Sequence, residues 1–464
     1  MSRIEHKYKK EATLARMVLT WITHAKRPLT LPELQHALSV EDGDTYFDED
    51  KIPDEYSIVS VCEGLISIDK ESTIIQMVHY TAKEYFYRMK GKWFPDADRY
   101  ITICCVTYLL FDSFDTGFCS TDAEFEARLR MNVLYSYAAR NWGRHAREAS
   151  EQPEKLILNF LESDAKVSSS SQAMMTVRGG HHYSQEAPRM SGIHVAAYYG
   201  LRESIFVLLK NGNDTNLRDT WNRTPLMWAT ENGHESVIQL LVEKGAEIDL
   251  EDSRGWTPLT LAVTNGYISV VKLLLKNGAF TEARVKNVDT ALLKAAEQGH
   301  EVIVKILLEK GAYIEAWDKN EERALLKAAE QGHEVIVKIL LEKGANIEAG
   351  KYGETALLKA AKQGHEAVIK ILLEKGAYIE ARDIYGEKAL LKAAKQGHEA
   401  VVQILLEKGA DIEAGDECGE TALVKAAEQG HEVVVQLLRE AGADIEAKNK
   451  NGDTVLEESP DSTN

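Results

Sequence analysis

One glycine recurs along the C-terminal part of this 464-residue chain at a spacing of 33 residues, with a single step of 32. The series runs through Gly200, Gly233, Gly266, Gly299, Gly332, Gly364, Gly397 and Gly430. The stretches 290–316 and 323–349 align without gaps and differ at only two positions. A single unit of this length cannot bury both of its faces, so the copies must stack on one another as a solenoid.

Each unit carries the pattern of two helices joined by a turn. Thr290 offers a side-chain acceptor at the start of the first helix. Gly299 supplies the left-handed residue that ends this helix. His300 starts the second helix, whose apolar residues recur at helical spacing over 302–307, and Gly311 closes it. A polar loop then leads to the next copy.

This pattern resembles the ankyrin repeat, whose T-P-L element is clearest at residues 224–226 and 257–259. The resemblance implies a mainly α fold, an ankyrin-repeat solenoid of about eight repeats. We expect the array over 191–456, including a partial ninth unit at 454–456, and a disordered tail over 457–464. The short step of 32 falls in the loop 348–354, where we expect a tighter hairpin rather than a broken solenoid.

The first 90 residues show a different pattern, that of a small winged-helix domain. An amphipathic helix is expected over 11–25, and Thr30-Leu31-Pro32-Glu33 is the capping-box opening of a second helix. A third helix follows at about 54–63. The alternating segments 65–68 and 73–78, separated by a turn, predict a β-hairpin. Three helices and a hairpin make up the winged-helix topology, so we assign the domain to residues 1–90.

Between this domain and the repeats, apolar periodicity predicts a helical spacer over residues 91–165. Its helices, with one more that closes the winged-helix domain, are expected over 80–90, 98–111, 121–142 and 152–163. Residues 166–190 contain Ser168–Ser171 and Gly179-Gly180. Serine and glycine runs are typical of connecting segments, so we expect a flexible linker there.

Three segments together resemble filamentous-fungal NACHT–ankyrin proteins, which are NOD-like receptors of the STAND class. They read TWITHAKRPLTLPELQHALSVE, SVCEGLISIDKESTIIQMVHYTAKEYF and SYAARNWGRHA. The resemblance implies a role in recognising self, nonself or microbial ligands in innate immunity or incompatibility. The winged helix of these proteins is often named after a GPI inositol-deacylase, and that name implies no deacylase site. The NTPase signature G-x-x-x-x-G-K-[ST] does not occur in this sequence. We therefore expect no nucleotide binding, and a truncated receptor, a decoy or an adaptor.

The charge balance narrows the classes of partner. The chain has 55 Lys and Arg against 73 Asp and Glu, a net charge of −18. This excess of acid disfavours nucleic acid and anionic membranes, and no apolar run approaches the ~18–20 residues of a membrane span. The five cysteines form no C-x-x-C pair, which favours free thiols in the cytoplasm.

No motif for catalysis, a metal or a cofactor is found, so we expect a non-catalytic protein with none of these sites. The repeat histidines from His234 to His431 would lie about 8–10 Å apart in stacked helices, too far to share one ion. They are expected to bond the backbone. The acidic run over 42–50 lacks the register of a calcium loop and is expected to be solvated. A lysine ladder runs through Lys294, Lys327, Lys359, Lys392 and Lys425. Pairing is expected where a glutamate lies three residues on, at Glu297, Glu330 and Glu428.

The hairpin tips of the repeats vary while the helices barely change, which indicates a surface for a protein or peptide partner. Tryptophan, tyrosine and arginine are the types enriched at binding hot spots. Lys362 and Lys395 replace an acid in two repeats, so the middle of the ladder is locally basic. We expect binding on the concave hairpin face by Trp317, Lys319, Tyr352, Arg382, Ile384 and Tyr385, beside Lys359 and Lys392. The two lysines predict a partner with some acidic character at the middle of the array.

Two other classes of function stay open. One is a DNA-binding regulator that uses the winged helix, although the third helix carries Asp54, Glu55 and Glu63 where groove readers need basic residues. The other is an enzyme or pathway scaffold with an unrecognised site in residues 1–165. No sequence motif names a substrate for it.

Overall fold

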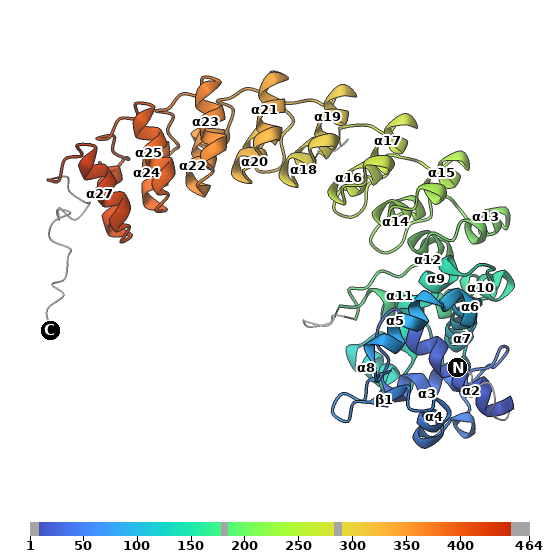
Figure 1. The fold of residues 1–464 in the computed structure, drawn as a ribbon. Coiled ribbons are helices and arrows are strands. Elements are labelled where there is room, and N and C mark those ends of the chain that lie inside the picture. The colour runs from blue at the N-terminus through green and yellow to red at the C-terminus, as the bar shows by residue number, and fades with distance from the viewer. Residues whose placement is uncertain (1–8, 178–183, 283–289, 447–464) are drawn as a thin grey trace, which may run out of the picture. The chain divides into compact units, whose positions relative to one another are not determined.

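The computed structural model describes residues 9–177, 184–282 and 290–446 (Figure 1). It divides into two compact units, one ending at Glu247 and one starting at Ile248, and each is described by itself. Almost all regular structure is α-helical, as expected. The proposed partial ninth repeat and the C-terminal tail lie outside the described residues.

The first unit opens with the three helices and the hairpin of a winged helix. The helices are α2 (Lys9–His24), α3 (Leu31–Ser39) and α4 (Glu55–Val61). The strands β1 (Ile66–Ile68) and β2 (Ile75–Met77) pair antiparallel, with Ser67 opposite Gln76. Thr30 adds a single bridge to Ile74, and its side chain caps α3 in the capping box that the sequence predicts. The winged-helix topology is confirmed.

The core of this domain forms on α2. Val18, Leu19 and Trp21 on this helix are fully buried. The helix packs against α3, α4 and α7, so one apolar stripe holds the domain together. The acidic loop after α3 is solvent-exposed and includes the short 3-10 helix η1 (Glu49–Lys51).

Six helices follow, of which two replace a single helix expected over 121–142. The chain breaks at Asn132, whose φ of −116° and ψ of 79° are not helical. Both its backbone N–H and its side-chain Nδ2 donate to the carbonyl of Arg128 at 3.0 Å. Asparagine offers the backbone this alternative to the helix, which explains the error. The helices are α5 (Tyr80–Arg88), α6 (Lys90–Trp93), α7 (Ala97–Leu109), α8 (Asp122–Met131), α9 (Tyr135–Glu148) and α10 (Glu154–Leu161).

The expected flexible linker is wrong over its first part, because residues 164–175 form helix α11 (Asp164–Met175). The serine run is buried and hydrogen-bonded rather than solvated. Ser169 Oγ accepts from Arg128 and lies 2.8 Å from the hydroxyl of Tyr135, while Gln172 bonds both backbone groups of Cys119. The glycines of the expected linker, at 179 and 180, lie outside the described residues.

The first repeat packs directly onto the spacer. Helix α12 (Gly192–Tyr199) contacts α9, α10 and α11. Tyr199 is buried against Gly143 of α9, and its hydroxyl donates to the carbonyl of Ala139 at 2.8 Å. The spacer and the first repeat therefore share one core.

The repeats are pairs of short helices. Within the second unit, the first helices of the pairs form one row and the second helices another (Figure 1). Alanines and leucines of the first helices are buried between neighbouring repeats. The first unit contains α12, α13 (Arg202–Lys210), α14 (Pro225–Glu231) and α15 (Glu235–Glu243). The second contains α16 (Pro258–Thr264), α17 (Ile268–Lys276), α18 (Ala291–Glu297), α19 (Glu301–Glu309), α20 (Ala324–Glu330), α21 (Glu334–Glu342), α22 (Ala356–Gln363), α23 (Glu366–Glu374), α24 (Ala389–Lys395), α25 (Glu399–Glu407), α26 (Ala422–Glu428) and α27 (Glu432–Glu440).

One aspartate organises the hairpin tip that precedes the first helix. Its Oδ1 accepts two backbone N–H groups of the same tip, at 2.8–3.0 Å. These aspartates are Asp219, Asp252, Asp318, Asp383 and Asp416. The loop that is one residue shorter has Gly350 at this position and forms a 3-10 turn, η3 (Lys351–Gly353), with Tyr352 at φ 55°. The tighter hairpin is confirmed, and α20, α22 and α24 stack across it without a gap.

The repeat histidines bond the backbone, as expected. The Nε2 of five of them donates to a carbonyl at the end of the preceding first helix, at 2.9–3.1 Å. Each ring also lies over the glycine that ends that helix, as His398 does over Gly364. These five are His234, His333, His365, His398 and His431. His300 differs, because its Nε2 has no hydrogen-bond partner in the described part of the chain.

Candidate functional site

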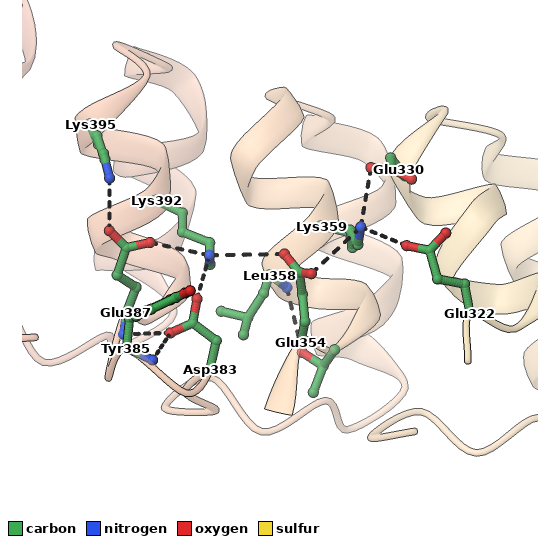
Figure 2. A network of polar contacts seen from close by, with 11 residues as sticks. Glu322, Glu330, Glu354, Leu358, Lys359, Asp383, Tyr385, Glu387, Lys392 and Lys395 are labelled. Atoms are coloured by element: carbon green, nitrogen blue, oxygen red, sulfur yellow. Dashed lines mark hydrogen bonds and ion pairs between the residues drawn. The ribbon is translucent and has the colours of Figure 1, made fainter. Parts of the chain in front are cut away.

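The lysine ladder on the first helices is held by carboxylates. Lys359 Nζ lies 2.8 Å from Glu322, 3.2 Å from Glu330 and 3.6 Å from Glu354. Figure 2 shows that Glu354 lies between this lysine and Lys392 and points toward both ammonium groups. One network of alternating charge therefore joins α22 to α24.

Lys392 is the most enclosed of these cations. Its Nζ lies 2.6 Å from Asp383 and 3.2 Å from Glu387, and its side chain is 7% exposed (Figure 2). Asp383 is the carboxylate that organises the hairpin tip, so its two oxygens do different work. Oδ1 holds the backbone N–H groups of Tyr385 and Glu387, and Oδ2 binds the lysine.

The expected pairing of lysine with the glutamate three residues on holds for Lys294, which binds Glu297 at 2.8 Å. It is not the general pattern. Lys327 binds Glu322, and Lys425 binds Glu420 and Asp416, all on the hairpin tip before the helix. The turn fixes the carboxylate of Asp416 and the backbones of Glu322 and Glu420, which reduces the entropic cost of pairing with the lysine.

The network shifts the pKa values of Lys392, Lys359 and Glu322 toward their charged forms. Burial would lower the pKa of Lys392, but the hydrogen bond to Asp383 and the charges of Asp383 and Glu387 outweigh it and raise that pKa. Burial would likewise lower the pKa of Lys359, and its glutamate partners raise it. Burial would raise the pKa of Glu322, but the hydrogen bonds from Lys327 and Lys359 outweigh this effect and lower it. These shifts favour the charged forms of Lys359, Lys392 and Glu322.

A pocket of about 440 Å³ opens above this network, and we name it the tip pocket. Its rim carries three exposed apolar or aromatic side chains, Tyr352 (62% exposed), Ile384 (48%) and Tyr385 (65%). Lys351 lies over the ring of Tyr352 at 4.8 Å and is paired with Glu321. The lining comprises Lys351, Tyr352, Glu354, Lys362, Asp383, Ile384, Tyr385, Glu387, Lys392, Lys395 and Gln396.

The eight expected partner-binding residues fall into three groups. Tyr352, Ile384, Tyr385 and Lys392 line the tip pocket. Arg382 instead lines a separate hollow with Tyr378, while Trp317 and Lys319 are exposed on the preceding hairpin tip, outside both. Lys359 lines neither.

Lys359 and Lys392 are not free surface cations. Both are buried and bound by at least two carboxylates each, which gives no support to the expectation that they contact an acidic partner. Two further lining residues were not among the expected contact residues, although the sequence analysis singled them out as lysines in place of an acid. Lys362 is exposed, and Lys395 is paired with Glu387 at 3.0 Å. Their replacement of an acid in the repeat pattern was the available signal.

Other candidate sites from the sequence contain no ligand geometry. In the acidic loop, Lys51 binds Asp44 and Glu41, so these carboxylates face a lysine. Over residues 9–177, 184–282 and 290–446, no group of three or more His, Cys, Asp or Glu is arranged to hold a metal ion. None of the described helices has the length and apolarity to cross a membrane.

Comparison with known families decides what the array is. The model described as ankyrin repeats (3 copies) matches residues 193–285, 280–351, 347–416 and 390–459, more than half of the chain. The chain is an ankyrin-repeat protein. The crystal structure of the human ASB11 ankyrin repeat domain is 29% identical to this ankyrin-repeat protein. The alignment covers 48% of this chain and 99% of that one, with a TM-score of 0.45. No curated protein matches the chain.

A second family model matches the start of this ankyrin-repeat protein. It is described as GPI inositol-deacylase, winged helix domain, and it matches residues 3–115. The match continues past the boundary expected at residue 90 and includes α7. The longer match agrees with the packing, because α2 of the winged helix packs against α7.

Proposed function

We propose that this ankyrin-repeat protein is a non-catalytic recognition protein that binds a peptide or protein partner at the tip pocket. The observation that carries the proposal is the convergence of Tyr352, Ile384 and Tyr385, all exposed, over a floor of fixed charges. Exposed aromatic side chains around a pocket are the anchors from which interfaces draw most of their binding energy. The partner would place apolar groups on this rim.

The charges of the pocket define the partner further. Lys392 is occupied by its carboxylates, but Lys362 is exposed at the rim. A partner carboxylate near Lys362 would gain a rim contact that mainly affects the rate of association. We therefore propose a partner segment with an apolar anchor and an acidic residue next to it.

We also propose a cellular role of the kind fulfilled by fungal NOD-like receptors. The support is the winged helix followed by helices and ankyrin repeats, together with the motifs that resemble the NACHT–ankyrin proteins. On this proposal the array recognises a self, nonself or microbial ligand in the cytoplasm, and the protein acts in signalling rather than catalysis.

The tip pocket is tested with the full chain as bait. Partners captured from a fungal extract are identified by mass spectrometry, and the strongest is purified for calorimetry. The double variant Tyr352→Ala/Tyr385→Ala should weaken its binding about tenfold or more, since each hot-spot tyrosine is worth about 1 kcal/mol or more.

Tyr378→Ala provides the matched control. This tyrosine is 62% exposed, as Tyr352 is, but it lines the separate hollow with Arg382. We expect its replacement to leave binding unchanged. Equal binding by the double variant, with helical circular dichroism intact, would place the partner elsewhere on the protein and refute the tip pocket.

A further inference from the structure

A third hollow, of about 740 Å³, lies in the first unit along one face of α9. Ser136, Arg140 and Arg144 line it and follow each other at four-residue spacing, so they form one stripe along the helix. We name this hollow the α9 groove. Its far wall comes from α8 and from the end of α11, segments that lie beside α9 only in the folded chain.

The α9 groove is lined by cations and by no acid. Lys26 and Arg27, from the loop after α2, join Arg140 and Arg144, and no Asp or Glu is among the lining residues. The groove is therefore locally basic, although the chain as a whole has a net charge of −18. Lys26 is bound by Glu148 at 2.7 Å, and Arg27 by Glu33 at 2.6 Å, so these two are largely neutralised.

The two arginines of α9 that line the groove are both exposed. Arg140 donates to the backbone carbonyls of Ala173 and Thr176. The guanidinium group of Arg144 makes no hydrogen bond or ion pair with any residue that the structure describes. Two like charges at i and i+4 of a helix repel each other, and an anion placed between them would remove that repulsion.

An apolar strip lies opposite the arginines. Leu129 and Met174 contribute to it, and Val177 at the end of α11 is 82% exposed. An exposed valine beside two exposed arginines offers a ligand one apolar and one cationic contact within the same groove.

We propose that the α9 groove binds an acidic segment of a partner protein, with a carboxylate on Arg144 and an apolar side chain on Val177. Guanidinium groups match carboxylates through paired hydrogen bonds. Pockets for small molecules enclose most of the ligand surface, whereas both arginines here remain exposed, which suits a polypeptide lying across the groove. Nucleic acid needs a continuous basic track, which the acids Glu33 and Glu148 behind the groove interrupt.

Two labelled mixtures of eight-residue peptides test the proposal by fluorescence anisotropy with the full chain. One mixture is randomised over Asp, Glu, Leu, Phe and Tyr, and the other has Asn and Gln in place of the acids. We expect the acidic mixture to bind at least about tenfold more tightly. Arg144→Gln should reduce its binding about tenfold, the loss of one charge-assisted contact.

Arg130→Gln is the matched control, because Arg130 is an exposed arginine of α8 that does not line the groove. It should bind as the unchanged chain does. Both arginine variants are also compared in the Tyr352→Ala/Tyr385→Ala background, where the tip pocket no longer contributes, and the effect of Arg144→Gln should persist there. Arg144 has no internal bond to lose, so its replacement should leave the fold intact. Equal binding of both mixtures, or binding insensitive to Arg144, overturns the proposal. Displacement of the peptides by millimolar phosphate, or tighter Arg144-dependent binding of a 20-base-pair duplex, also overturns it.

Discussion

Replacing Lys392 by methionine tests the reasoning about the charge network. Methionine keeps most of the volume and removes the cation, so Asp383 and Glu387 lose the ammonium group at 2.6 and 3.2 Å. Breaking a fully buried ion pair costs about 3–5 kcal/mol, and an exposed pair is worth about 0–1 kcal/mol. The side chains of Asp383 and Glu387 are 7% and 14% exposed, and Glu387 keeps Lys395. We therefore expect Lys392→Met to lower the local stability by about 2 kcal/mol, between the values for an exposed and a fully buried pair.

Hydrogen exchange of the full chain, followed by mass spectrometry, measures this loss locally, because a repeat array need not unfold in one step. Amides of residues 382–395 should exchange about 30-fold faster in Lys392→Met, which is the equivalent of 2 kcal/mol. Lys362→Met, on the exposed rim, should change exchange less than about twofold. Adding Asp383→Asn keeps the acceptor of the turn and removes one stranded charge, so it should recover part of the loss. Unchanged exchange in Lys392→Met would refute the account.

Two further predictions concern acid and the glycines. Burial lowers the pKa of His36, which stacks on Phe47, to about 4. On acidification the unfolded chain protonates this histidine first, near pH 6.5, because the folded state keeps it neutral down to about pH 4. The free energy of unfolding should therefore fall as the pH drops from about 6.5 to 4. We expect a loss of about 1 kcal/mol at pH 5, after allowing for solvent screening of a half-buried ring. Thermal unfolding of His36→Leu should show a smaller shift between pH 7 and 5, and an equal shift would contradict this. Gly364→Ala should lower the free energy of unfolding in urea by about 1 kcal/mol more than Gly376→Ala does. Both glycines have positive φ, so both substitutions strain the backbone. Only a Cβ at residue 364 would also meet a side chain, the ring of His398, at 2.7 Å. Equal losses would show that the ring moves aside freely.

The sequence predicted the parts of the fold that depend on neighbours within one or two turns of chain. The repeat period, the capping box at Thr30 and the hairpin after α4 all have local causes, and all are confirmed. Asn132 was misjudged because its side chain competes with the helix, an effect that apolar periodicity does not register.

The lysine ladder shows where sequence reasoning stops. Spacing along one helix suggested that Lys327 pairs with Glu330, but Glu330 binds Lys359 of the next repeat, and Lys327 binds Glu322 on the hairpin tip before its helix. Contacts of this kind follow from how repeats stack, and from the aspartate turn that fixes each tip. The α9 groove was missed for the same reason, because its walls come from α8, α9 and α11.

The hydrogen bonds between repeats give the array a direction. Two kinds of hydrogen bond run from a later repeat to an earlier one. In the first, a repeat histidine donates to a helix-end carbonyl, as His365 does to Glu330. In the second, a backbone amide after the second helix donates to a loop carboxylate of the preceding repeat, as Tyr378 does to Glu348. A fragment that ends after such a repeat therefore has carbonyl and carboxylate acceptors without their donors at its C-terminal end. A fragment that begins with such a repeat has donors without their acceptors at its N-terminal end. During synthesis from the N-terminus, the newest repeat would always expose an acceptor end, which the next repeat completes as it leaves the ribosome. Growth of the stack would then follow the order of translation.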